Sequence, residues 1–303
     1  MRKFELMGHR GARGLRPENT LPSFEFALDA GVDSIETDVL LTADHVPILC
    51  HEPILSDKLC RRIKRGAPAP KDKPYLSRLT LDQVRCYAAD GNLDPVRFPR
   101  QRAMVTPLAE MLAKEWGIDP FAIPTVAELF GLVRAYIGKE GKKAGKTIAQ
   151  QRHVRKVILD FELKRVPYQP ELVGDDFHGD GPGLMEKLLV EEIHRADMLK
   201  RSRARSFDHR ALAGIKLLQP QLTTALLISH TAPVSPVPIT RQAGADIYSP
   251  DYRFVDEELI RLAHADGIRV MPWTVNELAD WKRLLAWGVD GIATDFPDAR
   301  FIV

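Results

Sequence analysis

The sequence has little of several features that would each assign it to a particular class of protein. It contains only three cysteines, Cys50, Cys60 and Cys86, without the spacing of a metal or redox motif, which favours reduced thiols in a cytosolic setting. No stretch approaches the roughly 18 apolar residues that a membrane span needs, and the first residues lack the apolar run of a signal peptide. The formal net charge is only +2, so no overall field favours nucleic acid as a partner. We therefore expect a cytoplasmic protein, unless a signal sequence has been removed from the chain.

The chain has 303 residues, of which 45% are apolar, enough for a large core. This length suits two small domains or one α/β barrel with insertions, since such barrels often exceed about 250 residues as a single unit. Short apolar runs, most of them separated by helix-length spacers, indicate strands at residues 4–8, 34–41, 154–164, 205–208, 223–229, 245–249, 268–274 and 291–295. Eight strands that alternate with helices predict a (β/α)8 TIM barrel, which we interpret as a single domain over residues 1–303.

Residues 55–153 interrupt this alternation after the second strand, and we interpret them as an insertion without a separate core. Polar caps followed by helical periodicity predict helices after Thr20, Ser77 and Thr125. The run Lys58–Lys73 has seven Lys or Arg residues against one Asp. Two interpretations of this basic run remain open. It can lie over the barrel mouth as a lid that faces an anionic substrate, or it can be ordinary solvated surface.

Two carboxylates, Glu36 and Asp38, occur on the second predicted strand. Successive side chains on a strand point to opposite faces, so these two share one face. Such a pair is stable in a folded interior only if a cation or a shared proton compensates it, and hard divalent cations take oxygen ligands. The alternative is a solvent-facing edge strand. His9 and His51 end neighbouring apolar runs, and their proximity favours a functional site, since catalytic side chains of barrels lie at the C-terminal ends of strands.

Several short motifs together resemble the signature of the glycerophosphodiester phosphodiesterase family, whose pattern runs His-Arg, Glu-x-Asp and His-Asp. The motifs are His9-Arg10, Pro17-Glu18-Asn19-Thr20, Glu36-x-Asp38, His51-Glu52, Glu162-x-Lys164, Trp273-Thr274-Val275-Asn276 and Thr294-Asp295. This sequence has Glu52 where the family usually has Asp, which keeps a carboxylate but lengthens its reach by one methylene. The resemblance covers residues 7–52 and about 155–300 and is weak between them.

The resemblance implies metal-dependent hydrolysis of glycerophosphodiesters to glycerol 3-phosphate and an alcohol. In the family, the glutamate at the position of Glu162 completes the metal site. Glu36, Asp38 and Glu162 would then bind one divalent cation, for which Mg²⁺ or Ca²⁺ is indicated because all the ligands are oxygens.

The same resemblance suggests which residues act on the substrate. His9 and His51 would divide the general-acid and general-base roles, since histidine titrates near neutral pH. Arg10 and Lys164 would bind the non-bridging phosphate oxygens, because a guanidinium pairs with phosphate in a bidentate way and an ammonium acts as a point charge. Trp273 is the third residue that we assign to substrate binding. The partner is thus a small glycerophosphodiester.

Two other functions remain open from the sequence. A related class of barrel enzymes, phospholipases D that act on lysophospholipids or sphingomyelin, has the same paired histidines and acidic metal site, and the identity of the phosphate-bearing product separates it. The non-enzymatic alternative is a barrel that binds phosphorylated ligands without turnover. Metal-dependent cleavage of a simple phosphodiester would exclude that alternative.

Overall fold

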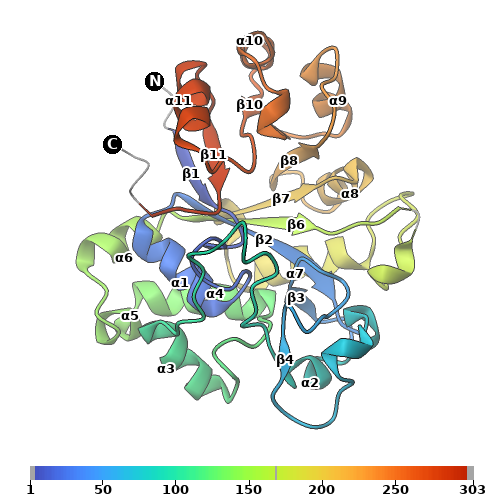
Figure 1. Cartoon of the computed structure of the whole chain (residues 1–303). Coiled ribbons are helices and arrows are strands. Elements are labelled where there is room, and N and C mark those ends of the chain that lie inside the picture. Colours follow the sequence, from blue (N-terminus) through green and yellow to red (C-terminus); the bar gives the residue numbers. More distant parts are fainter. Residues whose placement is uncertain (1–3, 168, 299–303) are drawn as a thin grey trace.

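Eight parallel strands form the wall of a nearly closed barrel in the computed structural model, which describes residues 4–167 and 169–298 (Figure 1). In chain order they are β1 (Glu5–Gly8), β2 (Ser34–Leu41), β6 (Ile158–Leu163), β7 (Ser202–Ser206), β8 (Thr223–Ile228), β9 (Ile247–Pro250), β10 (Arg269–Val270) and β11 (Gly291–Thr294). They follow one another around the sheet in the order β10–β9–β8–β7–β6–β2–β1–β11, so the first and last strands of the chain pair. A backbone hydrogen bond from Asp290 N to Val270 O (2.9 Å) connects the two ends of the sheet. The predicted TIM barrel is confirmed.

Helices pack against the outside of this wall and bury its apolar face. Those that follow the barrel strands are α1 (Leu21–Ala30), α7 (Leu184–Arg195), α8 (His209–Leu218), α9 (Pro236–Gln242), α10 (Glu257–Ala265) and α11 (Leu278–Ala286). Between β2 and β6 the chain forms α2 (Leu81–Val84), α3 (Pro107–Trp116), α4 (Val126–Ile137), α5 (Lys139–Lys143) and α6 (Ile148–Val154). Phe130 of α4 packs edge-on against Phe161 of β6, with ring centroids 5.6 Å apart, so α4 shares the main core of the barrel. Within the described residues, no helix has the length and apolar composition needed to cross a membrane.

The predicted helix starts are confirmed at Thr20 and Thr125 and wrong at Ser77. Thr20 caps α1, and Thr125 opens α4 with a capping box. Ser77 instead lies in a short 3-10 helix, Leu76–Arg78. The next helix, α2, starts after Thr80, whose side chain and the glutamine three residues later form the capping box.

Two of the predicted strand ranges start at the wrong residue. The range 154–164 starts too early, because Thr147 opens α6 with a capping box and β6 begins only at Ile158. The range 205–208 starts too late, because β7 already begins at Ser202. Charged side chains on β7 face the barrel interior, where a search for apolar runs does not find them. The other barrel strands lie within the predicted ranges or overlap them, whereas the short strands at residues 47–49, 61–62 and 87–88 were not among the predicted strands.

The first part of the region 55–153 packs beside the barrel around a small second core. Leu55, Leu76 and Tyr87 are buried there together with Leu40 of β2. The short strands around this core are β3 (Pro47–Leu49), which precedes the region, and β4 (Arg61–Arg62) and β5 (Tyr87–Ala88) within it. Because β3 pairs with β2 and the cluster contains residues of both strands, this second core is continuous with the barrel wall.

A chain of buried ion pairs fills part of the barrel interior between β1, β6 and β7. Glu5 lies 2.5 Å from Arg203, whose Nε lies 2.7 Å from Asp160 Oδ2, and Asp160 also binds Arg205. Arg269 approaches Glu5 from β10 at 2.9 Å. Buried charges are stable only when they are paired, so each of these side chains depends on its neighbours. This series of ion pairs ends at Arg205, whose side chain also lines the cavity at the barrel mouth.

Glu5 should make the stability of the protein depend on pH. Burial alone would raise the pKa of this carboxyl group, but the charges and hydrogen bonds of Arg203 and Arg269 hold it at about 2, against 4.5 for a free glutamate. A pKa that is lower in the folded state contributes stability above pH 4.5 that is lost as the pH falls towards 2. We expect Glu5→Gln to lower the free energy of unfolding at pH 7 by about 3 kcal/mol.

Urea denaturation of the wild type and Glu5→Gln between pH 7 and pH 2.5 measures this effect. The difference in unfolding free energy should shrink steadily as the pH falls below about 4.5. Glu115→Gln, at an exposed position on α3, is the control and should change stability by less than about 0.5 kcal/mol. A deficit of Glu5→Gln that stays constant with pH would contradict the assignment.

Candidate active site

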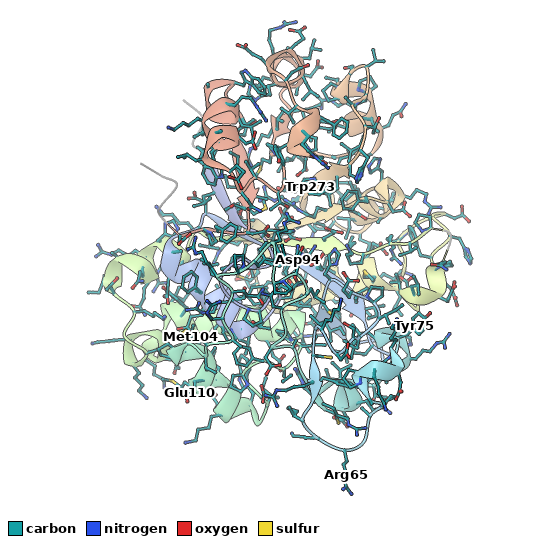
Figure 2. All side chains as sticks on the ribbon, in the orientation of Figure 1. Arg65, Tyr75, Asp94, Met104, Glu110 and Trp273 are labelled. Carbon is teal, nitrogen blue, oxygen red and sulfur yellow. The ribbon has the colours of Figure 1, made fainter. Side chains whose placement is uncertain are left out.

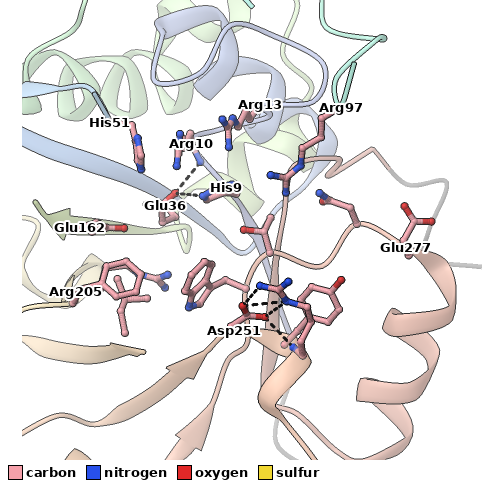
Figure 3. A pocket seen from close by; sticks show the side chains of 17 residues that line it. His9, Arg10, Arg13, Glu36, His51, Arg97, Glu162, Arg205, Asp251 and Glu277 are labelled. Carbon is pink, nitrogen blue, oxygen red and sulfur yellow. Dashed lines mark hydrogen bonds and ion pairs between the residues drawn. The ribbon is translucent and has the colours of Figure 1, made fainter. Parts of the chain in front are cut away.

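The candidate active site is a cavity of about 560 Å³ at the C-terminal ends of the barrel strands (Figure 3). Six of the eight predicted site residues line it, and they come from segments far apart in the sequence. The six are His9, Arg10, Glu36, His51, Glu162 and Trp273. The other two, Asp38 and Lys164, lie directly behind this lining, where Asp38 contacts Arg10 and Lys164 contacts Glu162.

Glu36, Asp38 and Glu162 form one buried acidic cluster. The parallel register of β2 and β6 places Asp38 opposite Glu162, and Glu36 precedes Asp38 by two residues on the same face of β2. One carboxylate oxygen from each residue lies within 4.8 Å of the other two. The three side chains are therefore close enough to hold a single metal ion.

The protein balances the charge of this cluster only in part. Burial and the neighbouring charge of Asp38 raise the pKa of Glu36 well above its usual value. Burial would also raise the pKa of Asp38, but the charges of Arg10, His51 and Lys164 hold it below its usual range. Asp38 Oδ1 is buried without a hydrogen-bond partner, and Lys164 Nζ is 3.6 Å away. An orphaned carboxylate oxygen beside a glutamate of raised pKa fits a divalent cation with oxygen ligands.

His9 lies between Asp295 and the acidic cluster. Its Nδ1 is 2.6 Å from Asp295 Oδ1, and its Nε2 is 3.8 Å from Glu36 Oε2. Burial lowers the pKa of His9 and outweighs the opposing effect of Asp295, so the ring is neutral at pH 7. With the proton on Nδ1, which the contact with Asp295 favours, Nε2 can accept a proton. Asn276 fixes Asp295 in turn by donating from Nδ2 to Oδ2 (2.7 Å).

His51 has a carboxylate partner of its own. Its Nδ1 lies 2.7 Å from Glu52 Oε1, and this hydrogen bond lowers the pKa of Glu52. The longer reach of Glu52, compared with the aspartate usual in the resembled family, therefore does not break the contact. The His51 side chain is 27% exposed and faces the cavity from the side opposite Arg205 in Figure 3. Each of the two histidines thus has a carboxylate on Nδ1.

Arg10 connects the first loop of the chain to the acidic cluster. Its backbone N–H donates to Glu36 Oε2 (2.9 Å), and its Nε lies 3.3 Å from Asp38 Oδ2. Nη1 donates to Glu18 (2.8 Å). The next residue, Gly11, has a φ of +81°, and a Cβ there would lie 2.6 Å from a serine hydroxyl of α1. Only glycine fits this turn, which holds the Arg10 guanidinium beside the cluster.

Lys164 and Trp273 take different places in the site. Lys164 Nζ lies 2.7 Å from Glu162 Oε1 and so neutralises one of the carboxylates. Trp273 lies on the opposite wall, where its indole Nε1 donates to Ser249 O (2.9 Å) and its ring meets Phe207 edge-on at 5.4 Å. This pair presents an apolar surface to the cavity.

Four further residues contribute to the site although the sequence prediction gives them no role. Glu18, Asn276 and Asp295 belong to the motifs of the resembled family. Their contacts depend on the folded loops: Glu18 binds Arg10, Asp295 binds His9, and Asn276 binds Asp295. Arg205 is only 2% exposed and lines the cavity from β7. The sequence placed it at the start of a predicted strand but gave no signal of a role in the site.

The insertion reaches the cavity through a different segment from the basic run. None of residues 58–73 is among the described residues that line the cavity. Arg65 lies at the lower end of the molecule in Figure 2, far from Trp273. Asp94 lies over the centre of the same view, and Arg97, from the loop 90–106, lines the cavity. The geometry therefore favours solvated surface for Lys58–Lys73 and assigns the mouth to the loop 90–106.

Known proteins with related sequences agree with this geometry. The model of the glycerophosphoryl diester phosphodiesterase family matches residues 9–180 and 176–299. The chain is 28% identical over 295 residues to a glycerophosphodiester phosphodiesterase of Caldanaerobacter subterraneus subsp. tengcongensis, with 97% of this chain and 94% of the relative covered. It is 27% identical to a glycerophosphodiester phosphodiesterase of Bacillus subtilis (strain 168), with 96% of this chain and 83% of the relative covered.

Solved structures give the same result for the fold. A protein of Silicibacter pomeroyi DSS-3 assigned to this family superposes with a TM-score of 0.76 at 28% identity, over 99% of this chain and 93% of the other. A phosphodiesterase of Oleispira antarctica, solved in complex with the product sn-glycerol-3-phosphate, superposes with a TM-score of 0.67 at 20% identity, over 97% and 94%. From the match to the family model over most of its length, the chain belongs to the glycerophosphoryl diester phosphodiesterase family.

Proposed function

We propose that the protein hydrolyses glycerophosphodiesters to glycerol 3-phosphate and an alcohol. The observation that carries this proposal is the convergence of three buried carboxylates and two carboxylate-paired histidines in one cavity. Relatives of nearly the same length are named glycerophosphodiester phosphodiesterases, and the related Oleispira antarctica structure contains sn-glycerol-3-phosphate as product.

In this proposal Glu36, Asp38 and Glu162 hold one divalent cation, Mg²⁺ or Ca²⁺. The buried, unpartnered Asp38 Oδ1 and the raised pKa of Glu36 support it, because both are compensated by a cation with oxygen ligands. Such a cation supplies Lewis-acid polarisation of a phosphoryl oxygen when it is bound. Lys164, ion-paired to Glu162, reduces the negative charge of the site and would bind a non-bridging oxygen of the phosphodiester.

The two histidines and Arg10 act on the phosphodiester itself. His9 is neutral and has Nε2 free, so it can take the proton of an attacking hydroxyl. His51, held by Glu52, then serves as the partner that gives a proton to the leaving alcohol. Arg10 points at the cluster and binds a non-bridging oxygen, and Trp273 packs against the carbon skeleton of the substrate.

Phospholipase D-type cleavage of lysophospholipids or sphingomyelin is the less favoured alternative, since the relatives compared above are named for glycerophosphodiesters.

We also propose that the chain is a single barrel domain with an insertion at about residues 55–153. The three buried cysteines Cys50, Cys60 and Cys86 form no disulfide, and a cytoplasmic location of the protein is proposed on this ground.

Phosphorus NMR of a panel of glycerophosphodiesters tests the function directly. We expect each hydrolysed diester to give the resonance of glycerol 3-phosphate, and the reaction to stop in excess EDTA. Lysophosphatidylcholine, included in the panel, should stay intact. A phosphate-bearing lipid as the main product would instead establish the phospholipase D-type reaction, and the absence of any product would leave ligand binding as the function.

A further inference from the structure

Among the described residues, one arginine at the cavity mouth, Arg97, has no close carboxylate partner. Its side chain is 51% exposed, and its contact with Asp295 Oδ2, at 3.5 Å, is at the limit for a hydrogen bond. That oxygen already accepts a hydrogen bond from Asn276 at 2.7 Å. The other arginines at the mouth have close partners: Arg13 lies 2.6 Å from Glu18, and Arg253 lies 2.6 Å from Asp251. Arg97 is therefore the mouth cation that is best able to bind an anion from solution.

The loop that carries Arg97 is held firmly against the catalytic loop of the barrel. Gln101 Nε2 donates to Arg13 O (2.7 Å), and Arg102 N donates to Leu15 O (3.1 Å). The guanidinium of Arg97 stacks on the ring of Phe98, 5.1 Å from its centroid, and Phe98 itself is buried. These contacts place the positive charge of Arg97 at a defined point of the mouth, so binding an anion there costs little additional ordering.

The position of Arg97 determines which part of a substrate it can meet. In Figure 3, Arg97 lies across His9 from Glu162, on the outer side of the cavity. Below the acidic cluster the barrel interior is filled by a buried apolar cluster that includes Met7 and Met271, so a substrate can extend only outwards. A phosphodiester bound at the acidic cluster can therefore extend one of its two ends past Arg97, which lines the same cavity.

We propose that Arg97 binds a second anionic group on the alcohol moiety and so selects glycerophosphodiesters whose alcohol carries a phosphate or carboxylate. This inference rests on the proposed function. The glycerol moiety is uncharged, so an extra anion can only come from the alcohol. Among the acidic side chains of the lining that the structure describes, Asp251 is paired with Arg253, and Glu277 is the only exposed carboxylate. Selection for the anion therefore depends on Arg97 and not on a general positive field.

A matched pair of substrates, glycerophosphoinositol and glycerophosphoinositol 4-phosphate, tests this inference because the two differ only in one anionic group. We expect kcat/KM of the wild type to be about 5- to 10-fold higher for the 4-phosphate at low ionic strength, and Arg97→Met to lose this preference. The control is Arg100→Met. Arg100 belongs to the same loop and is 40% exposed, but it is held by Asp298 at 2.6 Å and is absent from the described lining of the cavity. Its replacement should leave the preference unchanged.

Isothermal titration calorimetry with the same two compounds separates failure of this inference from failure of the proposed function. If the wild type turns over neither compound, the proposed function is wrong for this class of diester. Tighter binding of the 4-phosphate that Arg97→Met abolishes would still support the role of Arg97. Equal kcat/KM and equal affinity for the two compounds, or a preference that survives in Arg97→Met, would overturn it.

Discussion

Replacement of His9 by alanine is expected to lower kcat about 10²- to 10⁴-fold, the usual contribution of one positioned proton transfer. His9 is the histidine with the most restrictive surroundings: Asp295 holds Nδ1 at 2.6 Å, and burial keeps the ring neutral. Alanine removes the proton acceptor but leaves the three carboxylates in place. Steady-state kinetics with a glycerophosphodiester, together with calorimetric titration of the cation, measures both effects.

Two comparisons make this experiment decisive. His51→Ala should cost a similar factor in kcat, because His51 has its own carboxylate partner in Glu52 and faces the same cavity. His194→Ala removes an exposed histidine at the end of α7 and should leave kcat unchanged. Wild-type turnover in either His9→Ala or His51→Ala would refute the assignment of that residue, and loss of cation affinity in either variant would indicate a structural role.

Glu162→Gln should weaken cation binding at least 10- to 100-fold, the loss that even indirect support of a metal site typically causes. Glu162 is the most suitable of the three carboxylates for this test, since it is ion-paired with Lys164, whereas Asp38 also orders Arg10 and Asn19. Activity should fall with the affinity and return when the cation is raised into the millimolar range.

Thermal unfolding gives a measurement of cation binding that does not depend on turnover. A cation that binds only the folded wild type raises its melting temperature in proportion to the logarithm of the cation concentration. This rise should be much smaller in Glu162→Gln and unchanged in Glu171→Gln, an exposed control. Full activity of the wild type in excess EDTA, or an equal rise in all three proteins, would exclude the proposed metal site.

The sequence predicted the barrel well because most of its strands are short apolar runs between helix-length spacers. The strand prediction was inaccurate where a strand places charged side chains in the barrel interior. Arg203 and Arg205 interrupt the apolar pattern of β7, and their partners Asp160 and Glu5 lie on other strands. Periodicity along one segment cannot show that a charge will be neutralised by a strand that is distant in the sequence. The predicted strand 154–164 failed for a local reason, because its first residue, Val154, is still the last residue of α6.

The candidate site likewise contains residues that the sequence could predict and residues that it could not. Glu36 and Asp38 were recognisable because two carboxylates on one strand face are informative by themselves. The partner of His9, Asp295, occurs in a recognised motif, but the contact joins opposite ends of the chain and leaves no local signal. The position of Arg97 at the cavity mouth could not be predicted for another reason. The more obvious basic run lay elsewhere in the insertion, and only the folded loop shows which arginine reaches the mouth.

The pairing of β1 with β11 also affects when the enzyme can first act. His9 is made on the ribosome well before Asp295, which orients it and is 286 positions later in the chain. While β11 is still inside the ribosome, His9 lacks its partner Asp295, and the barrel wall lacks its closing strand. Contacts of such long sequence separation form late, because the loop between them must be closed first. Catalysis therefore begins only after β11 has been made and has paired with β1, and turnover reports molecules in which the barrel wall has closed.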